Sequence, residues 1–284
     1  MERRTLIELS DLNLAESYRE LSRRGGGTVL DEDGLLLFAG PHPLPFLVNG
    51  VMRTGAGPPA DEVLARASAF FYARARGFTV NVRAHADPDL EAAATAAGYT
   101  RLGEPPAMIL EGRLEDRDPP PGVTLRQVAT PADATAFALV NGEAYATYGM
   151  PRDVTPALFE RLDVLRAPHI ASFVVWVGDE PAAAAMTIVT HAVAGIYWVG
   201  TRPALRGRGL AELVTRVATN AGFDRGGRIA SLQASVMGEP VYRRMGYVEV
   251  TRYPNLTRLV ERPGRGREPE ASEADWSRLR RLPT

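Results

Sequence analysis

The clearest pattern of apolar and polar positions in the chain lies between residues 210 and 221. Apolar side chains recur there at the spacing of a helix, while polar side chains take the other face. The apolar set is Leu210, Leu213, Val214, Val217, Ala218 and Ala221, and the polar set is Glu212, Thr215, Arg216 and Asn220. This segment therefore predicts an amphipathic helix that is ended by Gly222 and Gly226-Gly227.

Helical and strand patterns fill the rest of the chain as two halves of the same order. In the first half they predict helices over residues 12–21, 61–76 and 89–97, and strands over 28–30, 35–38, 46–52 and 78–82. In the second half they predict further helices over 132–145, 156–165 and 239–245, and strands over 123–127, 170–177, 181–190, 195–201 and 229–235. Each half contains a short helix closed by Gly-Tyr, at residues 98–99 and 246–247. The shared order predicts two similar α/β units.

A charged and then proline-rich stretch over residues 115–122 separates the two halves. Three consecutive prolines cannot continue a helix, so the stretch is typical of an extended linker. We therefore expect domains over residues 1–116 and 123–261, joined by a linker at 117–122. The polar composition of residues 262–284 predicts a mobile C-terminal tail, with a helical turn or two over 275–282.

Composition and charge exclude several classes of protein. The chain has 33 basic and 34 acidic residues and a net charge of -1, so we expect neither nucleic acid nor an anionic membrane surface as a partner. It contains no cysteine, which excludes disulfides, thiolate metal sites and a cysteine nucleophile. Its four histidines are scattered without metal-ligand spacing, and every basic residue is arginine. No apolar run is long enough for a signal peptide or a membrane span, so the sequence predicts a cytoplasmic protein. It does not exclude a homodimer.

The loop between the predicted strand 195–201 and the amphipathic helix carries the strongest chemical signal. The start of a helix leaves amide hydrogens unpaired and carries a partial positive charge, so it can bind a phosphate group. Gly207 and Gly209 remove side chains that would hinder the approach of an anion, and Arg206 and Arg208 add two cations. The spacing excludes a P-loop, which needs a Lys-Ser or Lys-Thr pair, and a dinucleotide fingerprint, which needs glycine or alanine where Glu212 stands. For the short pattern alone, a surface turn remains the alternative.

Two segments in this order resemble the GNAT acyltransferase superfamily. Arg206, Gly209 and Ala211 fill the positions of its Arg/Gln-x-x-Gly-x-Gly/Ala loop, and residues 232–247 resemble its second signature, which ends in Tyr-x-x-x-Gly-Tyr at Tyr242. The resemblance covers residues 123–260. It implies two tandem GNAT-like domains, each an α+β unit with a mixed, mostly antiparallel sheet flanked by helices. It also implies acetyl-CoA as cosubstrate, without a metal.

The resemblance further implies roles for individual residues. Acetyl-CoA would be held by Val199, Gly200, Thr201, Arg206, Gly207, Arg208, Gly209, Leu210 and Ala211, and by Ser235 where many relatives have asparagine. The Val199 amide would polarise the thioester carbonyl. Tyr242 would be the general acid, because a phenol with a pKa of about 10 is protonated at neutral pH; the alternative is a ring packed in the core. Glu143 is the candidate base, although a helical glutamate is more often a surface charge and ordered water can replace it. Tyr145, Tyr148, Met150 and Phe159 are candidates for an acceptor pocket or for core packing.

The first half lacks both chemical positions. At the position that corresponds to the glycine-rich loop, it has residues 54–59, with two prolines and no arginine. At the position that corresponds to Tyr242, it has Ala94. We therefore expect a degenerate, structural first domain. The predicted function is transfer of an acetyl group from acetyl-CoA to a primary amine of a small molecule or peptide; the alternative is a non-catalytic acyl-CoA-binding regulatory module. Transfer of an aminoacyl group from tRNA is disfavoured by the near-neutral charge and the coenzyme A type of loop.

Overall fold

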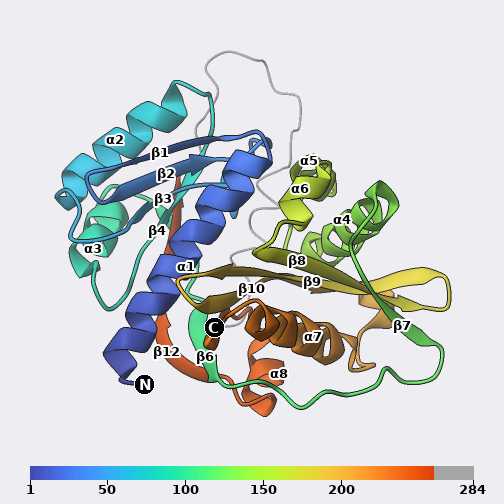
Figure 1. Cartoon of the computed structure of the whole chain (residues 1–284). Helices are drawn as coiled ribbons and strands as arrows, with labels where there is room; N and C mark the ends of the chain where they lie inside the picture. Colours follow the sequence, from blue (N-terminus) through green and yellow to red (C-terminus); the bar gives the residue numbers. More distant parts are fainter. Residues whose placement is uncertain (259–284) are drawn as a thin grey trace.

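The computed structural model describes residues 1–258, and the predicted tail over 262–284, with its helix over 275–282, lies outside the described residues. Two mixed, mostly antiparallel sheets form the core of the molecule (Figure 1). The first sheet has, in spatial order, β1 (Thr28–Glu32), β2 (Leu35–Ala39), β3 (Asn49–Arg53), β4 (Phe78–Asn81), β13 (Asn255–Arg258) and β5 (Thr100–Gly103). The second has β12 (Val248–Arg252), β6 (Pro106–Glu111), β11 (Ile229–Gln233), β10 (Val193–Thr201), β9 (Glu180–Thr190), β8 (Ile170–Val177) and β7 (Val123–Gln127).

Helices cover both sheets, as the sequence predicted for an α+β chain of two GNAT-like units. The helices α2 (Ala60–Tyr72) and α3 (Pro88–Ala96) pack on the first sheet. One face of the second sheet is covered by α4 (Pro131–Ala146), α5 (Val154–Phe159) and α6 (Leu162–Leu165), and the other face by α7 (Leu210–Asp224) and α8 (Glu239–Arg244). Figure 1 shows α1 (Arg3–Arg24) crossing between the two sheets, where its apolar side chains join buried residues of both. No helix within residues 1–258 combines the length and the apolar character needed to cross a membrane.

Each half contributes its last strand to the sheet of the other half. Strand β6 lies between β11 and β12, and β13 lies between β4 and β5. Both crossings use two-residue connections with proline second, Glu104-Pro105 and Tyr253-Pro254. A residue before proline favours extended backbone, so the chain continues across to the other sheet instead of turning back. Neither half therefore forms its sheet alone. The domain boundaries at 116 and 123 stay a prediction, and they divide the chain by sequence order and not by sheet.

The structure corrects two predicted helices. Helix α1 begins at Arg3 and not at residue 12, because much of its buried face consists of Ser10, Asn13 and Ser17, which give no apolar periodicity. The helix predicted over 156–165 is divided into α5 and α6, separated by Glu160 and Arg161.

In the structure the linker between the halves runs from Gly112 to Gly122, between β6 and β7, and its first part covers the polar face of α7. Thr215, Arg216 and Asn220 are all buried. The Asn220 side-chain amide donates to the carbonyl of Leu114 at 3.0 Å and accepts from the amide of Leu114 at 3.0 Å. The Arg216 guanidinium donates to the carbonyl of Glu115 at 2.8 Å. The linker is therefore bonded along the helix whose N-terminus forms the predicted phosphate site.

Candidate active site

The candidate site opens where two parallel strands of the second sheet separate. Strands β10 and β11 pair only over Val193–Gly195 and Ile229–Ser231, although β10 continues to Thr201. From Ile196 onward, the edge of β10 that faces β11 has no strand partner. The separation leaves backbone polar groups of β10 beyond Gly195 without a partner on β11.

A β-bulge lies on the part of β10 that is not paired with β11. Tyr197 pairs with Met186 and Gly200 with Ala184, so Trp198 and Val199 both lie opposite a single residue of β9. Trp198 has a φ of 52°. Its ring packs on the α4 side of the sheet, while Val199 packs on the α7 side. A bulge interrupts the ladder of hydrogen bonds, so it frees backbone groups of β10 at the position where the sequence placed the polarising amide of Val199.

The glycine-rich loop presents a row of free amides at the N-terminus of α7. The six consecutive backbone amides from Gly207 to Glu212 donate no hydrogen bond to any residue between 1 and 258. Gly207 and Gly209 have φ angles of 75° and 74°, which side chains other than glycine rarely adopt. This arrangement suits an anion with several oxygen atoms, such as a pyrophosphate, because the helix N-terminus adds partial positive charge.

The two arginines of the loop differ in their contacts. Arg206 donates to the carbonyl of Ala144 at 3.3 Å and to the hydroxyl of Thr147 at 3.1 Å, which fixes the loop to the C-terminal end of α4. Arg208 is exposed and has no hydrogen bond or ion pair with another described residue. The predicted phosphate contact of Arg206 stays a prediction, and of the two cations Arg208 has the freer side chain.

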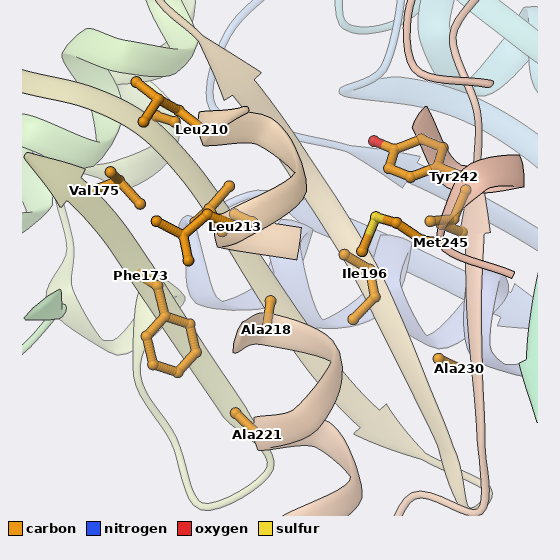
Figure 2. Packing of buried hydrophobic residues seen from close by; sticks show 14 of the residues in the cluster. Phe173, Val175, Ile196, Leu210, Leu213, Ala218, Ala221, Ala230, Tyr242 and Met245 are labelled. Carbon is orange, nitrogen blue, oxygen red and sulfur yellow. The ribbon is translucent and has the colours of Figure 1, made fainter. Parts of the chain in front are cut away.

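Tyr242 lies on α8 and is buried, with 7% of its surface exposed. It belongs to the buried cluster that includes Ile196, Leu210 and Met245, and Figure 2 shows its hydroxyl pointing toward the first turns of α7. Burial raises the pKa of Tyr242 well above the ordinary value, while the nearby Thr215 hydroxyl acts in the opposite direction. The Thr215 hydroxyl is buried and makes no hydrogen bond of good geometry to any described residue. Tyr242 is therefore a protonated donor at neutral pH.

Ser235 connects Tyr148 with the start of α8. The Tyr148 hydroxyl donates to Ser235 Oγ at 3.2 Å, and the same oxygen accepts from the amide of Gly238 at 3.1 Å. A Cβ at Gly238 would lie 2.8 Å from the Tyr242 ring, so glycine allows α8 to begin against that ring. The Ser235 hydroxyl thus lies close to the predicted acid, at the end of β11.

Glu143 is bound to an arginine. Its two carboxylate oxygens accept from Nε and Nη2 of Arg202 at 2.9 and 3.3 Å, and both side chains are about four-fifths buried. Hydrogen bonding to Glu143 raises the pKa of Arg202. The carboxylate therefore links α4 to the residue that follows β10.

The residues considered for an acceptor pocket divide into two groups. Met150 and Phe159 are buried and belong to one cluster with Trp198, and their part in an acceptor pocket stays a prediction. Tyr145 packs at 5.2 Å between ring centroids on Trp198 and at 6.2 Å on Tyr148. These tyrosines adjoin the bulge from the α4 side, and sequence reasoning did not identify Trp198 because a single tryptophan in a strand predicts only a buried side chain.

The corresponding place in the first half is closed by ion pairs. Strands β3 and β4 are parallel like β10 and β11, but Arg53 at the end of β3 donates to both oxygens of Asp89 at 2.8 and 2.9 Å. Arg83 binds Asp87 at 2.8 Å and the carbonyl of Gly55 at 2.7 Å. These bonds tie the strand end and the loop to the start of α3. No group of three or more His, Asp or Glu side chains within residues 1–258 is arranged to hold a metal ion.

Comparisons with known proteins agree with this fold. Residues 112–234 match the family model of the acetyltransferase (GNAT) domain. A solved GCN5-related N-acetyltransferase from Kribbella flavida is 22% identical, with a TM-score of 0.67 over 89% of this chain and 94% of that one. One from Sphaerobacter thermophilus is 18% identical, with a TM-score of 0.57 over 81% and 82%. A tandem GNAT protein from the clavulanic acid biosynthesis pathway is 17% identical, with a TM-score of 0.54 over 79% and 78%. No curated protein sequence matches the chain significantly.

The fold is that of the GNAT class of acetyltransferases. Residues 112–234 form a GNAT acetyltransferase domain, and the chain as a whole has a tandem GNAT architecture with two mixed sheets. The family match ends at Ala234, before the segment that carries Tyr242.

Proposed function

We propose that the chain is an N-acetyltransferase that transfers the acetyl group of acetyl-CoA to a primary amine of a small molecule or peptide, with its one working site in the second half. The observation that carries the proposal is the row of six free amides from Gly207 to Glu212, placed beside the opening between β10 and β11. The amides would bind the pyrophosphate, and the free edge of β10 would pair with the pantetheine arm. The Val199 amide at the bulge would stabilise negative charge on the thioester oxygen.

Tyr242 would supply the proton that the reaction needs. The amine nitrogen attacks the carbonyl carbon, the carbon–sulfur bond breaks, and the thiolate takes the hydroxyl proton of Tyr242. Burial keeps this hydroxyl protonated, and a thiolate formed in the same desolvated place is destabilised as well. The transfer therefore exchanges one buried anion for another.

The amine must lose a proton, and the contacts of Glu143 favour water as the immediate acceptor. Arg202 donates to both carboxylate oxygens of Glu143. The lone pairs that accept these two hydrogen bonds are therefore not available to take a proton from the amine. The sequence left water open as a substitute for a carboxylate base, and the ion pair supports that alternative.

Calorimetry with acetyl-CoA tests the site. We expect the wild type to bind and Arg208→Glu to bind about tenfold more weakly, because the new carboxylate repels the pyrophosphate. Arg228→Glu is the matched control, since Arg228 is also exposed but lies beyond the C-terminal end of α7, a helix about 22 Å long. No binding by the wild type would refute the proposal, and equal affinity of the wild type and Arg208→Glu would remove Arg208 from the site.

A non-catalytic acyl-CoA-binding regulatory module is the second candidate, and the engagement of Glu143 by Arg202 is the observation that favours it. The two candidates differ in turnover. A panel of small-molecule and peptide amines, assayed for release of free CoA, should reveal an acceptor if the chain is an enzyme. Tight binding of acetyl-CoA without release for any amine would favour the regulatory module.

A further inference from the structure

Helix α1 of the first half lies across the point where β10 and β11 separate. It packs against β9, β10 and β11 of the second sheet as well as against the first sheet. The last paired residues of the two parallel strands are Gly195 and Ser231. Both of them contact buried polar side chains of α1.

Asn13 makes the larger set of contacts. It is fully buried, and its amide nitrogen donates to the carbonyls of Ile188 and Val193 at 3.1 and 3.2 Å and to the hydroxyl of Thr190 at 2.8 Å. Its Oδ1 accepts from the hydroxyl of Tyr197 at 2.6 Å. One side chain of the first half thus bonds both strands of the β9–β10 hairpin and the residue just before the bulge.

The close approach of α1 depends on small side chains at the two paired positions. A Cβ at Gly195 would overlap Oδ1 of Asn13 and the ring of Tyr197. On the other strand, Ser231 Oγ lies 2.9 Å from Ser10 Oγ, and both serines are buried. Glycine and serine therefore let α1 hold the two strands at the place where they stop pairing.

We infer that α1 is a positioning element for acyl transfer, in which Asn13 and Tyr197 fix the direction of the bulge at Trp198 and Val199. The inference rests on the proposed function, since the bulge matters only if its amide meets the thioester. Tyr197 immediately precedes the bulge and its hydroxyl is fixed by a buried partner, so loss of that bond lets the strand turn about its axis. The first half, which lacks a phosphate loop of its own, acts on the reaction through this helix.

The test compares Tyr197→Phe with Tyr253→Phe. Both remove a buried hydroxyl that donates at 2.6 Å to a side chain of α1, to Asn13 in one case and to Asp11 in the other. Only Tyr197 lies on β10. For Tyr197→Phe we expect faster hydrogen exchange at residues 196–201 and about a tenfold fall in kcat, because a misplaced reacting group costs rate steeply. The Kd for acetyl-CoA should stay within about twofold, since the loop at 207–212 is untouched. For Tyr253→Phe we expect no change in exchange at residues 196–201 or in kcat.

The outcomes separate this inference from the proposed function. Equal exchange at 196–201 and equal kcat in Tyr197→Phe and the wild type would overturn the inference. A general loss of thermal stability in both variants, with kcat unchanged in both, would also overturn it, because α1 would then serve the fold alone. If the wild type does not bind acetyl-CoA, the proposed function fails, and exchange at 196–201 still decides whether α1 holds the bulge.

Discussion

Raising the pH above 10 should unfold this protein, because the folded chain keeps many of its tyrosines protonated. Burial raises the pKa of six of the nine tyrosines in the sequence: Tyr18, Tyr145, Tyr197, Tyr242, Tyr247 and Tyr253. The chain has neither lysine nor cysteine. Tyrosines are therefore nearly the only side chains whose charge changes between about pH 9 and 11.5.

The sign and size of the effect follow from proton linkage. A group whose pKa is raised in the folded state favours folding below its ordinary value, and that contribution is lost as pH rises above it. At pH 11, one unit above the ordinary tyrosine value of about 10, each buried tyrosine favours the unfolded state by about 1 to 1.5 kcal/mol. Six of them together contribute about 6 to 9 kcal/mol, which is comparable with the 5–15 kcal/mol that stabilise a typical folded protein.

Urea unfolding followed by circular dichroism at pH 8, 9, 10 and 11 measures the effect. The free energy of unfolding should be level up to about pH 9 and then fall steeply. Tyr253→Phe should reduce the fall by about one sixth, whereas Tyr72→Phe, at a position that is 68% exposed, should not change it. A rise of tyrosinate absorbance at 295 nm near pH 10 with an amplitude that corresponds to all nine tyrosines, while the circular dichroism is still native, would refute the reasoning.

Three substitutions test other parts of the structure. Tyr242→Phe should lower kcat by about 10² to 10⁴ while the Kd for acetyl-CoA stays constant in calorimetry, and unchanged turnover would remove its acid role. Gly195→Ala should lower the free energy of unfolding in urea by about 1–3 kcal/mol, because its Cβ overlaps Asn13; an unchanged urea midpoint would contradict the packing described. Asn220→Ala leaves the amide and carbonyl of Leu114 without partners, so it should cost about 2 kcal/mol and expose the linker to proteases; a cleavage rate equal to that of the wild type would show that the linker is held elsewhere.

The sequence predicted best what depends on local patterns. The apolar residues spaced over 210–221 pack on the second sheet from α7, and the strands predicted over 28–30 and 35–38 pair as β1 and β2. The loop was found because glycine and arginine there follow a strand and precede a helix, and its free amides fit that interpretation. These patterns can be recognised in the sequence alone, because each of them involves residues that are close together in the chain.

Features that need distant partners escaped the sequence analysis. The ion pair of Glu143 with Arg202 and the attachment of Arg206 to α4 join residues 59 and 62 positions apart in the chain. The polar side chains of α7 gave no sign of a partner in the sequence, but the linker binds Arg216 and Asn220. The strand exchange did leave a signal, because Pro105 and Pro254 each follow a predicted Gly-Tyr helix and favour an extended connection. Periodicity alone does not show which sheet an extended segment will join.

The exchange makes the two halves depend on each other physically. Strand β6 of the first half pairs with five residues of β11, from Ile229 to Gln233, so without it β11 would become an exposed edge beside the site. Strand β13 of the second half likewise separates β4 from β5. In the first half, Arg53 and Asp89 tie the end of β3 to α3. This half nevertheless supplies a central strand of the other sheet, and its helix α1 contacts Gly195. Loss of binding chemistry in the first half leaves these structural contributions intact, because they depend on backbone pairing and buried packing and not on the phosphate loop.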